Sequence, residues 1–181
     1  MIIIETPRLV LRRFRADDLD ELCLLYADAE VRRFFPEGVL NRAQTREELD
    51  WHLNGDAPGS PLLELWATIH RPTGRLIGRC GFIRWVIEDQ PEIEIAYLLS
   101  KEFWRQGLGA EVACALVQHG LVRLARPRLI ALIAPGNVAS VRTAERAGLR
   151  FERVIDFDGK EAQLYSVHAE GVAGLQQLVD R

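Results

Sequence analysis

The residues best suited to chemistry lie in the stretch EIEIAYLLSKEFWRQGLGAEVACALV, positions 92 to 117. It begins as an alternating strand, on which Glu92 and Glu94 share one face because successive side chains point to opposite faces. A positioned carboxylate can take a proton from an attacking group, so each is a candidate general base. Carboxylates are also common on solvated strand faces, and that interpretation stays open.

A glycine-rich turn, WRQGLG (104–109), joins this strand to an expected helix. The first amides of a helix lack carbonyl partners, and the helix dipole is positive at that end. Gly107 and Gly109 remove side chains that would block a close approach, and Arg105 adds positive charge. These features predict an anion site, best matched to phosphate. Alternatively, the glycines only let the helix start close to the sheet.

Two common nucleotide sites fit this turn poorly. A phosphate-binding loop of the Walker type needs glycine, four residues and then Gly-Lys-Ser/Thr, which the chain lacks. A dinucleotide fingerprint needs a third glycine, and Val112 stands in that place. A protein that binds ATP or NAD through this turn is therefore disfavoured.

The elements that position these residues can be read from periodicity and turn signals. We expect strands over 8–14, 62–70, 75–86, 92–99, 128–134, 150–157 and 161–168, and helices near 17–26, 45–53, 107–123 and 137–147. The segment 56–61 reads as a loop, and 169–181 as a tail or short amphipathic helix. This order predicts a mixed α/β sheet with helices on its faces, and not a doubly wound parallel sheet.

Size and composition fit one domain over residues 1–181. The chain is 48% hydrophobic and 27% charged, with net charge −3 and a pI near 5.9. That balance argues against a general nucleic-acid binder, which needs a basic surface. No apolar run is long enough to span a membrane, so we expect no membrane partner. Cytoplasm is the expected location.

Cysteines and histidines give no metal signature. The three cysteines, Cys23, Cys80 and Cys114, are scattered through apolar runs, so we expect buried thiols. The four histidines are dispersed without ligand spacing, and no metal site is expected.

The stretch FWRQGLGAEVACAL resembles the acyl-CoA pyrophosphate loop of the GNAT N-acetyltransferase superfamily, whose pattern is Gln/Arg-x-x-Gly-x-Gly/Ala. Trp104 replaces the Gln or Arg. An aromatic residue there, with a nearby glutamate (Glu111 here), is usual in the branch of ribosomal-protein alanine N-acetyltransferases and their relatives. Three more stretches resemble that branch, in the expected order from about residue 4 to 168: ETPRLVLRRFRADD, TGRLIGRCGF and NVASVRTAERAGLRFE.

The resemblance implies about seven mostly antiparallel strands flanked by about four helices. It also implies transfer of an acetyl group from acetyl-CoA, the co-substrate, directly to a primary amine. The pantetheine arm would contact backbone groups near Leu98 and Leu99. The pyrophosphate would be held by amides of the turn: Arg105, Gln106, Gly107, Leu108, Gly109 and Ala110.

For catalysis, the resemblance makes Glu94 the first choice of base, because it matches the glutamate of the family's "E-I-G-Y" strand. Glu92 is the reserve. Many GNAT proteins place a tyrosine, the proton donor to the departing thiolate, where this chain has Ala144. Ser140 is the nearest hydroxyl in the expected helix, and Asn137 could bind pantetheine or an ordered water. Capping of the helix would equally explain both residues.

Other site residues follow less directly. Tyr97 and Tyr165 are further hydroxyl candidates, each better explained as core packing. Arg142 and Arg146 share a helix face and could meet the adenosine 3′-phosphate, although exposed helix arginines are usually solvated.

The acceptor stays open among peptide N-termini, aminoglycosides, polyamines and small amines. In the family, the pocket is walled by the N-terminal helices and the last hairpin. The matching residues here are 34–38, Trp51, Trp85 and 156–160, with Glu88, Asp89, Glu92 and Glu94 adding negative charge nearby. That charge would suit a cationic amine. A homodimer is possible, as among relatives, and a catalytically silent acyl-CoA-binding module is the alternative, favoured by Ala144.

Overall fold

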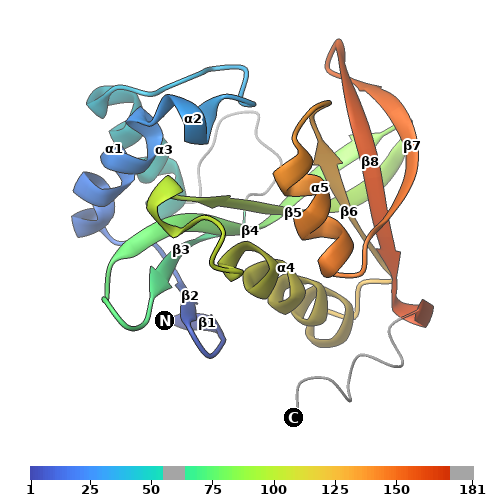
Figure 1. The fold of residues 1–181 in the computed structure, drawn as a ribbon, viewed down its shortest axis with the longest axis horizontal. Coiled ribbons are helices and arrows are strands. Elements are labelled where there is room, and N and C mark those ends of the chain that lie inside the picture. Colours follow the sequence, from blue (N-terminus) through green and yellow to red (C-terminus); the bar gives the residue numbers. More distant parts are fainter. Residues whose placement is uncertain (55–63, 172–181) are drawn as a thin grey trace.

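One eight-stranded sheet organises the protein (Figure 1). The computed structural model describes residues 1–54 and 64–171. The strands are β1 (Ile2–Glu5), β2 (Leu9–Arg12), β3 (Glu64–His70), β4 (Leu76–Ile87), β5 (Gln90–Leu99), β6 (Arg128–Ile133), β7 (Arg150–Phe157) and β8 (Lys160–His168). They lie in the order β1-β2-β3-β4-β5-β6-β8-β7. All neighbours are antiparallel except β5 and β6.

Five helices accompany the sheet in the described residues: α1 (Leu19–Ala27), α2 (Ala29–Arg32), α3 (Arg42–Asn54), α4 (Leu108–Gln118) and α5 (Val138–Arg146). The predicted mixed α/β class is confirmed, but the sequence missed β1 and α2. β1 consists of three isoleucines and Glu5 without apolar–polar alternation, and α2 is a single turn, capped by Asp28. The expected helix 107–123 ends as an α-helix at Gln118 and continues as one π-helical turn.

Two predicted segments lie wholly or partly outside the described residues. The expected loop 56–61 lies outside the described residues. Of the expected tail 169–181, only a 3-10 turn at Ala169–Gly171 is described.

Strand β5 lies at the centre of the core and contributes to both faces of the sheet. Ile95 and Leu99 pack in the cluster that contains α4, whereas Leu98 packs with residues of α1 and α3. Leu116 of α4 is fully buried in the first cluster, which stabilises the fold by about 2–3 kcal/mol relative to exposure. Strand β5 is thus held by helices on both sides.

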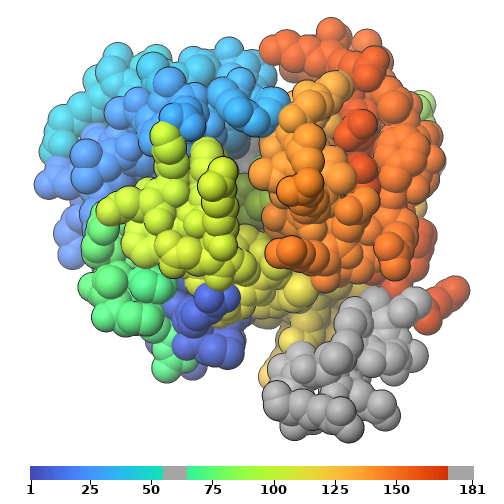
Figure 2. Space-filling model, viewed as in Figure 1, coloured from blue at the N-terminus to red at the C-terminus, as the bar shows by residue number. Residues whose placement is uncertain are grey.

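The β5–β6 pairing is short, and this opens the sheet. Glu94 and Ile130 form the one registered pair of the two parallel strands. Two residues beyond Ile130, the Leu132 amide donates to the Glu94 carboxylate and not to a backbone carbonyl of β5. Figure 2 shows a groove in this region, between the yellow-green segment that follows β5 and the orange α5.

The cysteine prediction was wrong in part. Cys80 is buried and Cys23 half-buried, but Cys114 is exposed. Cys114 lies on α4, whose neighbouring positions Val112, Ala113 and Leu116 face the core, so its own direction is outward. Within residues 1–54 and 64–171, no helix is long and apolar enough to cross a membrane.

Candidate active site

Glu94 lies half-buried at the point where β5 and β6 separate. Its Oε2 accepts a hydrogen bond from Trp85 Nε1 at 2.7 Å, and its Oε1 accepts one from the Leu132 amide at 3.2 Å. Burial raises the pKa of Glu94 to about 7, although both hydrogen bonds favour the charged form. A carboxylate with that pKa can exchange a proton near neutral pH.

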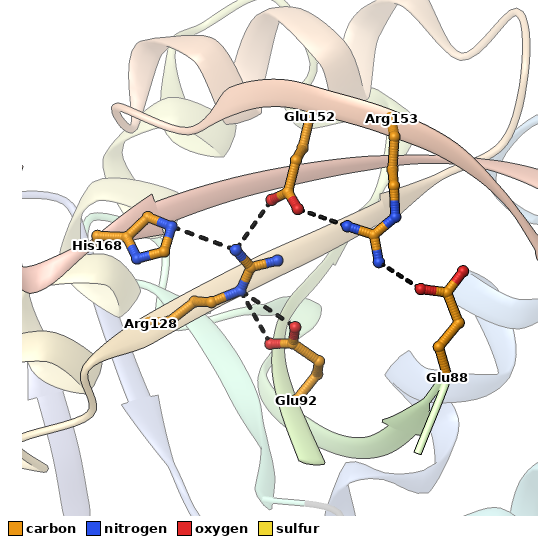
Figure 3. Close-up of polar contacts among 6 residues, drawn as sticks. All are labelled: Glu88, Glu92, Arg128, Glu152, Arg153 and His168. Atoms are coloured by element: carbon orange, nitrogen blue, oxygen red, sulfur yellow. Dashed lines mark hydrogen bonds and ion pairs between the residues drawn. The ribbon is translucent and has the colours of Figure 1, made fainter. Parts of the chain in front are cut away.

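Glu92 shares the face of Glu94 but has a different environment (Figure 3). Arg128 Nε lies 3.1 Å from its Oε1, and Arg128 Nη1 also reaches Glu152 at 2.9 Å. Arg153 extends this ion-pair network to Glu88, at 2.8 Å. Because its carboxylate is paired with Arg128, Glu92 is less available than Glu94 as a proton acceptor.

The turn before α4 has a backbone suited to an anion. Arg105 and Gly107 both have left-handed φ angles, 61° and 79°, and Gly107 is the N-cap residue. No side chain caps the helix, so the first amides, at Leu108, Gly109 and Ala110, have no intrahelical acceptor. Three donors therefore meet the positive end of the helix dipole at an exposed turn.

A polar clamp, formed by Thr6, Arg8 and Glu111, holds this turn. Arg8 Nε pairs with Glu111 at 2.6 Å, and Arg8 Nη1 donates to the Gln106 carbonyl at 2.8 Å. The Thr6 hydroxyl also donates to Glu111, at 2.6 Å. Sequence reasoning treated Glu111 only as a mark of resemblance and missed the clamp. Threonine and arginine two residues apart were the available signal, but their partner lies about a hundred residues away.

The remaining residues of the turn have packing partners of their own. Gly109 faces Thr143 of α5, whose Oγ1 would lie 3.5 Å from an added Cβ. Gln106 Nε2 donates to the Glu102 carbonyl at 3.0 Å. A Cβ at Gly109 would make only ordinary contact with Thr143, so the packing of α4 against α5 does not require glycine there.

The backbone of Leu98 and Leu99 is partly engaged. The Leu98 carbonyl lies so close to Gly78 of β4 that a Cβ there would be 2.1 Å from it. The Leu99 carbonyl accepts a hydrogen bond from Trp104 Nε1 at 2.8 Å. Since a carbonyl oxygen has two lone pairs, Leu99 retains one for a ligand. Trp104, which departs from the family pattern, therefore supports the end of β5.

At α5, Asn137 caps the helix by accepting a hydrogen bond from the Ser140 amide at 3.2 Å. The Ser140 hydroxyl lies 3.0 Å from the Tyr97 hydroxyl, which also donates to the Ser140 carbonyl. Burial raises the pKa of Tyr97. The fold thus brings together two hydroxyl candidates that sequence reasoning had considered separately.

Other candidates lie apart from this arrangement. Arg142 and Arg146 are exposed on α5, and Tyr165 packs in the main core. Among the described residues, no group of three or more His, Cys, Asp or Glu could hold a metal ion. An open depression of about 610 Å³, between α1, the start of β4 and residues 100–102, includes neither Glu94 nor Ser140.

The walls expected for the acceptor gather around Glu94 and Arg79. Trp85, which binds Glu94, packs edge-on against Phe157 with ring centroids 4.8 Å apart. Phe35 lies under the guanidinium groups of Arg32 and Arg79.

Arg128 and Arg153 together offset two of the three carboxylates that they bind, Glu88, Glu92 and Glu152, so one net negative charge remains in this network.

The fold and this site define an acyltransferase of the GNAT class, and comparison with known families agrees. Residues 8–150 match the family described as "Acetyltransferase (GNAT) domain", so the chain belongs to the GNAT acetyltransferases. The resemblance found in the sequence is confirmed at that level.

Individual relatives extend this comparison. The chain is 31% identical to the uncharacterized protein YkkB of Bacillus subtilis (strain 168), over 78% of this chain and 81% of that protein. It is similar in structure to a GNAT-family acetyltransferase from Bacillus anthracis, with TM-score 0.80 and 23% identity, covering 94% and 99% of the two chains. It also resembles RimL, a ribosomal L7/L12 alpha-N-protein acetyltransferase solved with coenzyme A, with TM-score 0.71 and 19% identity, covering 93% and 98%.

Proposed function

We propose that this protein transfers an acetyl group from acetyl-CoA to a primary amine, by direct attack in a ternary complex. The observation that carries the proposal is Glu94, a carboxylate with a pKa near 7 at the separation of β5 and β6. Such a base is matched to removing a proton from an amine at neutral pH. Glu92, engaged by Arg128, stays the reserve.

Acetyl-CoA binds along the groove between β5 and α5 in this proposal. The turn amides from Arg105 to Ala110 hold the pyrophosphate, supported by the three unpaired donors and the clamp behind them. The pantetheine arm contacts the backbone at Leu98 and Leu99, and the amide of Asn137. The donors are already oriented, so little ordering entropy is lost on binding.

In the transfer step, the amine nitrogen forms a bond to the thioester carbonyl carbon, and the carbon–sulfur bond breaks. Glu94 accepts the proton that the amine loses. The departing thiolate takes a proton from the Ser140 hydroxyl, which Tyr97 orients and which regains a proton from solvent, or it leaves unprotonated. The hydroxyl pair occupies the role that the tyrosine at the Ala144 position plays in many relatives.

The acceptor is a protein N-terminus or a small amine. The alternative function, a catalytically silent acyl-CoA-binding module, is favoured by one observation: Ala144 is buried and has no hydroxyl.

One measurement separates these functions. The protein is mixed with acetyl-CoA and a panel of amines, and free thiol is followed over time. We expect amine-dependent thiol release. Binding of acetyl-CoA without thiol release on a broad panel would favour the silent module, and no binding of coenzyme A would refute both.

A further inference from the structure

Arg79 of β4 is a buried arginine on the same face of the sheet as Glu94. Arg79 is 8% exposed, and Leu98 is its cross-strand partner on β5. Glu94 pairs with Ile83, and partners across a strand pair point to the same face. The pair between them is Gly81 with Ala96, neither of which has a side chain beyond Cβ. The sheet itself therefore places no bulk between the candidate base and the guanidinium.

The guanidinium of Arg79 has charged and aromatic neighbours, but one of its nitrogens lacks a hydrogen bond. It lies 5.7 Å from the ring centre of Tyr26 and 5.6 Å from that of Phe35. Its Nε is 3.5 Å from Glu48 Oε1, and within the described residues this buried Nε has no hydrogen-bond partner. The same Glu48 oxygen already accepts a hydrogen bond from the Tyr26 hydroxyl at 2.6 Å. Glu48 thus supplies a counter-charge without a hydrogen bond to the Arg79 Nε.

The neighbouring Arg32 shows the contrast. It is 2% exposed, but its Nε donates to the Gly38 carbonyl at 2.7 Å and its Nη2 lies 3.4 Å from Glu37. Buried polar groups in folded proteins almost always have partners, because an unmade hydrogen bond costs free energy. Arg32 follows this rule, whereas Arg79 Nε does not. Arg126 Nε also lacks a partner within the described residues, but Arg126 lies in the loop before β6, so Arg79 is the one of the two that lies on the strand face of Glu94.

Two further carboxylates near this face are already paired. Glu92 and Glu88 pair with Arg128 and Arg153 at the far end of β5 (Figure 3). A ligand carboxylate would match the planar fork of a guanidinium, which binds two oxygens at once.

We propose that Arg79 is an anion-binding subsite of the acceptor pocket, and that the acceptor is an amine carrying a carboxylate several bonds from the reacting nitrogen. The proposal rests on the proposed acetyl transfer at Glu94. Leu98, the partner of Arg79, lies four positions after Glu94, which is about 13 Å along a strand. Burial raises the pKa of Glu94 and the charge of Arg79 acts to lower it, so the two groups lie within electrostatic reach of each other, and a linear amino acid can bridge them.

The test compares matched amines. Thiol release is measured with ε-aminocaproate against its carboxamide, and with triglycine against its carboxamide. We expect kcat/KM to favour each carboxylate by at least about tenfold, mainly through KM, since hydrogen bonds to charged groups are the strong ones. Arg79→Gln should bring this ratio close to unity, and Arg79→Lys should leave an intermediate ratio because it keeps the charge without the fork. Arg33 is an exposed arginine at the C-terminal end of α2, next to Arg32. Arg33→Gln is the control that should keep the wild-type ratio.

The ratio of kcat/KM for carboxylate and carboxamide is taken within one protein, so any general loss of activity cancels. Removing Arg79 alone strands the buried Glu48, whose pKa is held at about 2 against the effect of burial by His52, Arg79 and Tyr26. If Arg79→Gln does not fold, the double variant Arg79→Met with Glu48→Gln removes both charges and gives the same ratio test. Coenzyme A binding by calorimetry verifies that each variant is folded.

Two outcomes overturn the subsite: equal kcat/KM for carboxylate and carboxamide in the wild type, or a wild-type ratio in the Arg79 variants. Binding of ε-aminocaproate is also measured by calorimetry, without acetyl-CoA. Arg79-dependent binding without any thiol release would refute the proposed acetyl transfer and leave the subsite standing. Thiol release without Arg79-dependent selection would refute the subsite and leave the proposed acetyl transfer standing.

Discussion

Replacing Glu94 with glutamine removes the candidate base and changes little else in shape. The wild-type side chain uses separate oxygens for Trp85 Nε1 and the Leu132 amide. A glutamine offers one carbonyl oxygen, so one of the two donors loses its partner, which costs about 1 kcal/mol. The chemical effect should be larger, because a positioned general base typically contributes about 10²–10⁴-fold. We expect turnover to fall by that factor, with coenzyme A affinity unchanged.

The pH dependence tests the pKa itself. With a pKa of about 7, Glu94 is mostly protonated at pH 6 and mostly ionised at pH 8. The ratio of wild-type to Glu94→Gln kcat/KM should therefore rise about tenfold from pH 6 upward and level off above pH 8. Using the ratio cancels the ionisation of the amine. A flat ratio, or unchanged turnover in Glu94→Gln, would refute Glu94 as the base.

Stability gives a readout independent of activity. The folded pKa of Glu94 is raised, so its contribution to stability is fully present below pH 4.5 and is lost as pH rises through about 7. The interval between 4.5 and about 7 corresponds to about 3 kcal/mol in the free energy of unfolding, as an upper limit. Urea unfolding at pH 5 and pH 8 should show this loss in the wild type and not in Glu94→Gln. The control is Glu102→Gln, at an exposed carboxylate paired with Arg75.

Three further predictions concern strand β5 and the turn that joins it to α4. Gly107→Val should weaken coenzyme A binding at least about tenfold by calorimetry, because φ is +79° and a branched side chain is strained there; wild-type affinity would contradict the assigned turn. Arg8→Ala and Glu111→Gln should each weaken coenzyme A binding, and the double variant should be no worse than the stronger single one, since both break one clamp; additive losses would show independent roles. Gly78→Ala should destabilise the fold by about 3 kcal/mol in urea unfolding, because its Cβ would lie 2.1 Å from the Leu98 carbonyl; a stability within about 0.5 kcal/mol of wild type would refute that close approach.

Local patterns predicted most of the elements. Alternation located β4 and β5, and the glycine turn located the start of α4 within one residue. The patterns failed where an element was too short for periodicity to show, as in β1 and α2. They also failed at Cys114, because an apolar run does not specify which side of a helix faces the core.

The electrostatic environment of each carboxylate was harder to predict than the secondary structure. Glu92 and Glu94 are equivalent in the sequence, two residues apart on one face. Arg128 pairs with one, whereas burial beside Trp85 and β6 raises the pKa of the other. Those partners come from strands that are distant in the chain, so the environment of each carboxylate depends on sheet order.

The sequence by itself determined the class of the protein, because strand alternation, the glycine turn before a helix and the ordered motifs are local in the chain. The tertiary structure decided how the charged groups are used. It paired Glu92, left Glu94 poised to exchange a proton, clamped the turn through Arg8, and buried Arg79 without a full set of partners. The physical reason is that burial and ion pairing depend on which distant segments meet, and the sheet order β4-β5-β6 brings them together.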